Sequence, residues 1–150
     1  MQHHKKVIQF PAPPIWTFWD FIYPNGSNPI KDWYSGGDYG LSDEGRYMFD
    51  ALLKNMRRTE NHLNWGGFRG FLKGAAKSER IWEIGFQAEG KQYRVFSVFG
   101  GRKQVILLVG CYHKQRVYTP ADAIETAIKR SKLLAEKGAT INERPIRDDF

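Results

Sequence analysis

Three apolar runs separated by short turns lie in the middle of the chain, at Ile81–Gln87, Gln92–Phe99 and Gln104–Tyr112. They are rich in Val, Ile, Phe, Tyr and Trp, the residues that favour β-strands. The linking segments Ala88-Glu89-Gly90 and Gly100-Gly101-Arg102 are short enough for hairpin turns. The pattern therefore predicts a three-stranded antiparallel meander.

Two other segments carry apolar residues at the spacing of an α-helix. Ser42 is a typical N-cap residue, which predicts a first helix over about residues 43–58. Thr119-Pro120 is typical of a helix start, which predicts a second helix over about residues 120–137. The apolar stripe of the first helix consists of Met48, Leu52 and Met56. The chain is therefore predicted to be an α+β protein, with a small antiparallel sheet and helices packed on one face.

The 150 residues are predicted to form a single domain. Its early part is dense in Pro and Gly, so we expect an irregular arm with one helical turn around Ile15–Phe21. Aromatic residues such as Trp16 and Trp19 are expected to pack on the domain, because a solvated linker would not carry such an apolar load. A stacking platform for bases is the alternative. The predicted parts are an arm at 11–40, a core at about 41–137 and a polar tail at 139–150.

The basic residues are concentrated in the later part of the chain. The formal net charge is +7, whereas residues 1–50 carry four basic and six acidic side chains, so residues 51–150 carry +9. A basic surface points to nucleic acid, acidic protein or anionic membrane as a partner, or to solubility alone. No apolar run is long enough for a transmembrane helix, and the single cysteine suits a reducing compartment. We therefore expect a cytoplasmic protein that does not bind membranes.

The chain lacks the residue patterns of several enzyme classes. One cysteine and four histidines do not fall at zinc-ligand spacing, and no serine lies in a Gly-x-Ser-x-Gly context. The remaining candidates for chemistry are basic or aromatic, namely Arg94, His113, Lys114, Arg116 and Tyr118. Such a set suits RNA cleavage without a metal or cofactor, in which the RNA 2′-hydroxyl attacks the adjacent phosphate. A cation stabilises the phosphate, and a base and an acid move the protons.

Each candidate also has a purely structural interpretation. Arg94 alternates with the apolar residues Tyr93 and Val95, so it needs solvent, a carboxylate or a ligand phosphate. Glu83 across the meander is the candidate carboxylate. His113 is equally consistent with a loop histidine whose hydrogen bonds are satisfied.

The order and spacing of these motifs resemble the RelE/HigB-like toxins of type II toxin–antitoxin modules, most closely the phage-derived HigB-like branch. That family shows an L-W-E-L-R strand, a Y-R-V-F/Y strand, an apolar strand ending in aromatic-x-Lys-Lys, and a Thr-Pro before the last helix. The corresponding segments here are Ile81-Trp82-Glu83-Ile84-Gly85, Tyr93-Arg94-Val95-Phe96, Tyr112-His113-Lys114-Gln115 and Thr119-Pro120. The resemblance covers about residues 41–137, and it assigns the family's first strand to Lys5–Phe10.

The resemblance implies an endoribonuclease that cleaves mRNA without a metal, either at the ribosome or free of it, and a cognate antitoxin as its protein partner. It implies Arg94 as the phosphate-contacting arginine, Lys114 as a basic site residue and Tyr118 as the site tyrosine. His113 joins these catalytic candidates from the chemistry above. We expect the last helix to cover the Tyr93 side of the sheet, which leaves Arg94 exposed to RNA. Further RNA-binding residues are expected to be Arg69, Lys73, Arg102 and Arg116.

The chain departs from the family pattern in three places. Gly85 stands where the pattern has an arginine, Gln115 replaces the second lysine, and the arm at 11–40 is extra. Two other functions therefore stay open. One is a non-catalytic binder on the same scaffold, directed at gyrase like the ParE-type toxins or at a phage or host protein. The other is a basic RNA-binding module.

Overall fold

The computed structural model describes residues 13–114 and 116–146. The strands are β1 (Thr17–Ile22), β2 (Phe68–Phe71), β3 (Trp82–Ala88), β4 (Lys91–Phe99), β5 (Gln104–Lys114), β6 (Val117–Thr119) and β7 (Thr140–Arg144). The helices are α1 (Pro29–Ser35), α2 (Asp43–Arg57) and α3 (Ala123–Ala135), with 3₁₀ turns η1 (His62–Asn64) and η2 (Gly74–Glu79). The strands form one sheet in the order β2-β3-β4-β5-β1-β7, and β6 pairs with β5. This mixture of helices and mostly antiparallel strands confirms the predicted α+β class.

The predicted meander is confirmed as β3, β4 and β5. The three strands pair in antiparallel fashion, with Gly85 opposite Arg94 and Arg94 opposite Cys111. Glu89 and Gly90 link β3 to β4, and their φ values of 50° and 75° suit the twist of a tight hairpin. The meander thus fixes which side chains of the three strands share a face.

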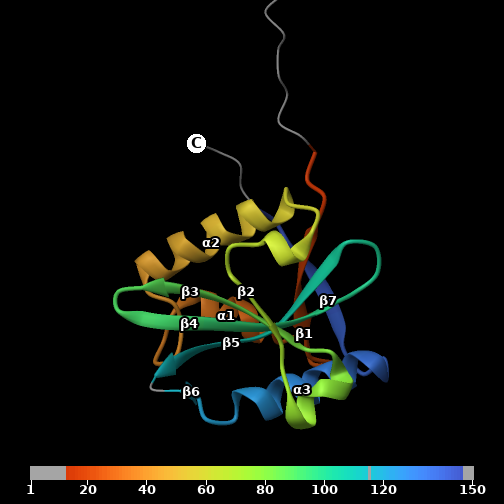
Figure 1. Cartoon of the computed structure of the whole chain (residues 1–150). Helices are drawn as coiled ribbons and strands as arrows, with labels where there is room; N and C mark the ends of the chain where they lie inside the picture. The colour runs from red at the N-terminus through yellow and green to blue at the C-terminus, as the bar shows by residue number, and fades with distance from the viewer. Residues whose placement is uncertain (1–12, 115, 147–150) are drawn as a thin grey trace, which may run out of the picture.

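Helices cover both faces of the sheet, as Figure 1 shows. On what we call the first face, α1 and α2 pack against the strands, and Phe49 and Leu53 share a core with Val95. On the second face, α3 and η2 pack, and Ala127 shares a core with Phe96. The prediction that the helices pack on one face is therefore wrong. Val95 and Phe96 point to opposite faces and both are fully buried, so each face needs a cover.

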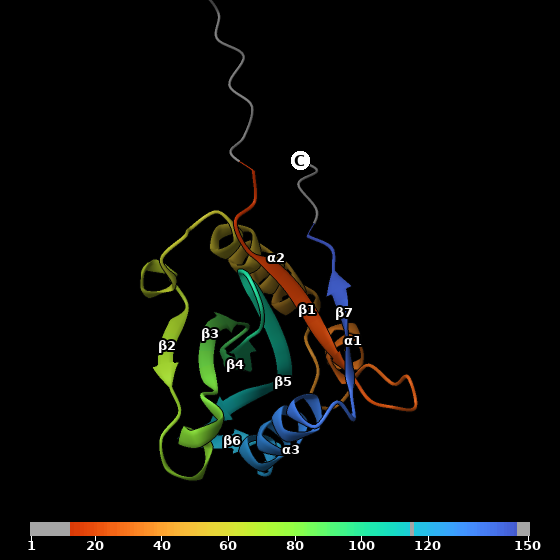
Figure 2. The same ribbon diagram turned by 90° about the vertical axis from the view of Figure 1, so that its right-hand side faces the viewer.

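The arm contributes a strand to the sheet instead of a helical turn. β1 pairs in parallel with β5 and in antiparallel fashion with β7, and Figure 2 shows it between them. Its aromatic side chains serve both cores, since Phe18 lies in the first-face core and Phe21 in the second-face core. A helical turn at Ile15–Phe21 is therefore wrong, whereas the packing of the arm is confirmed, with Trp16 buried. The strand expected at Lys5–Phe10 lies outside the described residues.

The predicted tail also enters the sheet. Within the predicted tail, β7 pairs with β1. Across this strand pair, Arg144 Nε lies 2.8 Å from Asp20 Oδ1. The strand is polar because it lies at the edge of the sheet, where only some of its side chains meet the core. The polar composition of the tail therefore led to the prediction of a tail outside the fold, although these residues form an edge strand.

The first predicted helix is confirmed as α2, and the Ser42 side chain accepts a hydrogen bond from the Gly45 backbone N–H. The second begins at Ala123, three residues later than predicted. Thr119 is not its N-cap, because Thr119 pairs with Tyr112 and ends β6. Within residues 13–114 and 116–146, no helix is both long and apolar enough to cross a membrane.

Candidate functional site

Arg94 and Glu83 form an ion pair on the second face of the sheet. Glu83 lies two residues along β3 from Gly85, the residue opposite Arg94, so both side chains share a face. Arg94 Nε lies 3.0 Å from Glu83 Oε1, and Arg94 Nη1 donates a hydrogen bond of 2.9 Å to the backbone carbonyl of Tyr93. The ion-pair interpretation of Arg94 is confirmed.

The expectation that Arg94 stands open to RNA is wrong. Its side chain is only 7% exposed, and that of Glu83 is 12% exposed. The last helix covers the face that carries Arg94, not the opposite one. A guanidinium drawn out of water in this way needs a carboxylate, which Glu83 supplies.

Tyr118 joins this ion pair from β6. The strand pairs with the end of β5 and places Tyr118 opposite His113. The Tyr118 hydroxyl donates a hydrogen bond of 2.8 Å to Glu83 Oε2, and the ring stands edge-on to Phe96. Burial raises the pKa of Tyr118 well above its usual range, and the hydrogen bond and negative charge of Glu83 raise it further. Tyr118 is therefore a neutral hydrogen-bond donor at physiological pH.

His113 lies on the same face and contacts the Tyr118 ring at a centroid distance of 5.0 Å. Of the four predicted catalytic side chains, Arg94 and Tyr118 thus contact the Glu83 carboxylate, and His113 contacts the Tyr118 ring. We call Glu83, Arg94, His113 and Tyr118 the Glu83 cluster. Lys114 follows His113 directly in β5, so strand alternation places it on the opposite face, where it is exposed. The structure does not bring Lys114 to the cluster.

Gly85 lies directly beside the cluster, and two arginines fill the space above it. A Cβ atom at Gly85 would lie 2.6 Å from Arg94 Nη1 and 2.8 Å from Cδ of Arg69. Arg69 belongs to β2, the strand next to β3 at the edge of the sheet. Arg69 is exposed, unlike Arg94. The site therefore has a buried cation and an exposed cation close to the same point.

The other predicted RNA-binding residues lie at different distances from the cluster. Arg116 is exposed in the turn between β5 and β6, close in sequence to Tyr118. Lys73 is exposed just before η2. Arg102 is exposed in the β4–β5 turn, at the opposite end of this hairpin from Arg94. Arg69 is therefore placed beside the cluster, and Arg116 is close to it in sequence.

Glu83 is the site residue that the sequence interpretation missed as a functional group. The sequence indicated it only as an ion partner of Arg94, although strand alternation already placed the two on one face. The second contact of Glu83, with Tyr118, depends on the β5–β6 hairpin, which no apolar pattern in the sequence predicts. Within the described ranges, no three His, Cys, Asp or Glu side chains gather into a group that could hold a metal ion.

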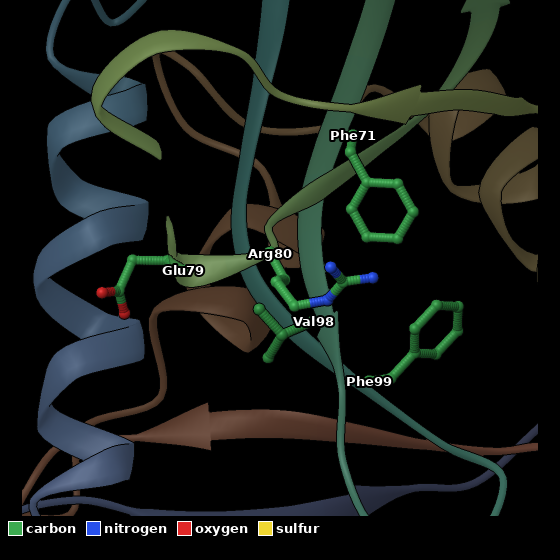
Figure 3. Close-up of a pocket in the computed structure, with 5 residues that line it drawn as sticks. All are labelled: Phe71, Glu79, Arg80, Val98 and Phe99. Atoms are coloured by element: carbon green, nitrogen blue, oxygen red, sulfur yellow. The ribbon is translucent and has the colours of Figure 1, made fainter. Parts of the chain in front are cut away.

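A small hollow lies near the start of β3 and is drawn in Figure 3. Its volume is about 210 Å³, and it is lined by Phe71, Glu79, Arg80, Val98 and Phe99. The Arg80 guanidinium lies 5.1 Å from the centre of the Phe71 ring, and in Figure 3 it points toward the two phenylalanine rings. The hollow is smaller than the roughly 300–1,000 Å³ of typical small-molecule sites.

Comparison with known proteins gives one family match. The family described as phage-derived protein Gp49-like (DUF891) matches residues 40–132, which is more than half of the 150 residues. The matched span contains α2, the strands β2 to β6 and most of α3, and hence the whole Glu83 cluster. No curated protein and no solved structure matches the chain significantly.

Proposed function

Because the chain belongs to the phage-derived Gp49-like family, which is of the RelE/HigB-like toxin type, we propose that it is a toxin that cleaves RNA. The observation that supports this proposal is that Arg94 and Tyr118 both contact Glu83, with His113 against the Tyr118 ring. A nuclease needs cations and proton-transfer groups within reach of one phosphate. A surface that only binds a partner has no need to gather them.

The RNA supplies the nucleophile in the proposed reaction. A base takes the proton of the 2′-hydroxyl, and the 2′-oxygen then attacks the adjacent phosphorus. The bond from phosphorus to the 5′-oxygen breaks, and an acid gives this oxygen a proton. The products are a 2′,3′-cyclic phosphate and a 5′-hydroxyl, and no metal takes part.

The Glu83 cluster supplies the groups for these steps. His113 is the base, because imidazole is the side chain that most often serves as a general base and His113 lies against the Tyr118 ring. Tyr118 is the acid, because its hydroxyl carries a proton at neutral pH and the leaving 5′-oxygen, an alkoxide, is basic enough to take it. Arg94 holds Glu83, and Glu83 orients the Tyr118 hydroxyl. Lys114 has no step in this scheme, because it lies on the opposite face.

A cognate antitoxin is the protein partner that fits this function. Residues 51–150 carry a net charge of +9, so an antitoxin segment with acidic side chains would be attracted to them. Salt screens exposed charges over about 8 Å at physiological ionic strength, so the complex should weaken as salt is added. Co-purification with the product of the neighbouring gene at low and high salt tests this proposal.

A cleavage assay tests the proposed activity directly. Labelled single-stranded RNA is incubated with the protein, with and without ribosomes and with and without EDTA. We expect cleavage that EDTA leaves intact, and a loss of about 10²-fold or more in Tyr118→Phe, because the proton donor is removed. Tyr47→Phe is the matched control, since Tyr47 is an exposed tyrosine of α2, the helix that covers the first face. Abolition by EDTA, or equal rates in both variants, would contradict the mechanism.

One observation favours a non-catalytic binder as the second candidate. The charge of Arg94 is neutralised by Glu83, and its side chain is almost fully buried. A nuclease normally offers its cation to the phosphate, whereas a structural ion pair has no such requirement. The absence of cleavage by the wild-type protein, with or without ribosomes, would select this candidate.

A further inference from the structure

The space above Gly85 is the most informative feature that the proposed reaction leaves unused. Gly85 lies on β3 directly opposite Arg94, so a side chain at this position would point to the second face, beside Glu83. Three atoms of Arg69 and Arg94 lie within 3.0 Å of the point where its Cβ would be. The glycine thus allows two arginine side chains to come together where one residue of β3 would otherwise stand.

A bulge in β2 brings Arg69 to this space. Phe68 pairs with Ile84 and Gly70 pairs with Glu83, so β2 advances two residues where β3 advances one. Arg69 is the extra residue of this bulge. Gly70 adopts a φ of 100°, which side chains other than hydrogen rarely allow. Bulges re-aim side chains at the edges of sheets, and here the re-aimed side chain is that of Arg69.

The charges around Gly85 do not balance. Glu83 uses one carboxylate oxygen for Arg94 and the other for the Tyr118 hydroxyl. Arg69 forms no ion pair within the described part of the chain, and it is exposed. Two arginine side chains therefore lie beside Gly85, but the one carboxylate there is engaged by Arg94 and Tyr118, so the positive charge of Arg69 remains at the open side of the cluster. An anion that reached this position would be attracted by Arg69 directly and by the field of Arg94.

We propose that Arg69 is the residue that binds the scissile phosphate of single-stranded RNA at this site. Its planar guanidinium offers paired N–H donors to the phosphate oxygens, which is the geometry that phosphate recognition favours. Arg94 is a positioning residue beneath it, because Arg94 is engaged by Glu83 and by the Tyr93 carbonyl. The inference rests on the proposed function, since it names the phosphate contact of the same site.

The test separates RNA binding from RNA cleavage. A fluorescein-labelled single-stranded 2′-O-methyl RNA cannot be cleaved, because its 2′-oxygen carries no proton to lose. Its dissociation constant is measured by fluorescence anisotropy over a series of salt concentrations. Each phosphate contact contributes about 0.7 to the slope of log affinity against log salt for a single strand. The variants are Arg69→Ala and Arg69→Lys, with Lys129→Ala as the control that removes one exposed charge from α3.

We expect Arg69→Ala to bind about tenfold more weakly and to lose about 0.7 of the slope. Arg69→Lys should keep the slope, because it keeps the charge, and Lys129→Ala should resemble the wild type. The inference is overturned if Arg69→Ala keeps the wild-type slope and affinity, if Arg69→Lys loses the slope as fully as Arg69→Ala does, or if the wild type does not bind the probe. The proposed function fails separately if the expected binding pattern is found but unmodified RNA is not cleaved.

Discussion

The two faces of the sheet differ in what they bury, although the same strands build both. On the first face, β4 presents Tyr93 and Val95 to an apolar core that includes Phe49 and Leu53 of α2. On the second face, the side chains of Phe96 and Val98 join the α3 core, whereas the adjacent Arg94 site is charged. Each face buries an ion pair at a desolvation cost, Asp20 with Arg144 on the first face and Glu83 with Arg94 on the second. The pair on the second face also accepts a hydrogen bond from Tyr118, beside which His113 lies, and this end of the second face is where we propose that the chemistry takes place.

The largest expected effect comes from opening the first face. Phe49→Ala should destabilise the protein by about 3–5 kcal/mol, because Phe49 is fully buried and its removal leaves a cavity between α2 and the sheet. Urea unfolding followed by circular dichroism measures this loss. Leu63→Ala, at an exposed position in η1, is the control and should change stability little. A small loss in Phe49→Ala would mean that the first face does not carry the stability.

The second-largest effect should come from breaking the buried ion pair. Arg94→Ala should cost about 2–3 kcal/mol, because it leaves the Glu83 carboxylate without its charged partner. Had Arg94 been exposed as predicted, its removal would barely have changed stability. It also means that Arg94→Ala alone does not test the chemistry, because a folding defect would lower activity too.

A double variant separates the two roles of that pair. Replacing both partners with apolar residues of similar size, as in Glu83→Leu with Arg94→Met, should restore most of the stability. RNA cleavage should nevertheless stay lost, because Tyr118 no longer has its acceptor. Restored cleavage in the double variant would show that the charged end of the second face is structural only.

A smaller effect is expected from Tyr118→Phe, which should cost about 1 kcal/mol by removing one hydrogen bond to Glu83. Since the folded-state pKa of Tyr118 is raised above 10.0, the unfolded state loses the proton first as pH rises. Its contribution to stability is therefore complete below about pH 10 and is lost above it. Urea midpoints on both sides of pH 10 should fall more steeply for the wild type than for Tyr118→Phe. Parallel slopes would contradict the assignment.

The smallest expected effect is on the chemical reactivity of Cys111, which lies on the second face opposite Arg94. Burial raises the pKa of its thiol to about 12, and the charge of Glu83 adds to this effect. Little thiolate exists near neutral pH, so an alkylating reagent should modify the folded protein slowly and the urea-unfolded protein fast. Mass spectrometry of timed samples measures both rates. Equal rates would show that this end of the second face opens to solvent.

The parts of the fold that local pattern predicts are those whose contacts are local. The meander and α2 follow from apolar spacing and from Ser42. β1 does not follow from local pattern, because its aromatic residues lie in a Pro- and Gly-rich segment that predicts an irregular arm. They form a strand because β5 and β7 pair with them on either side. The position of α3 shifts for the same reason, since the pairing of Thr119 with Tyr112 is invisible in the sequence.

The site divides in a similar way. Strand alternation places Glu83 and Arg94 on one face, whereas the contact of Tyr118 with Glu83 depends on the β5–β6 hairpin. The contact of Arg69 with the space above Gly85 depends on a bulge between two strands, and no periodic pattern encodes the register of such a bulge. Burial of Arg94 likewise depends on which face α3 covers, which is a property of the whole sheet.

The position of β1 has a consequence for how the chain acquires its shape. Phe18 pairs with Val105 on one side and with Arg144 on the other. β1 is therefore synthesised well before both of the strands with which it pairs. Pairings between residues so distant in sequence raise the contact order, which slows folding because the entropy of closing long loops is lost before the contacts form. A growing chain therefore exposes the unpaired edge of β1 until β7 has been made, and the sheet is completed only then.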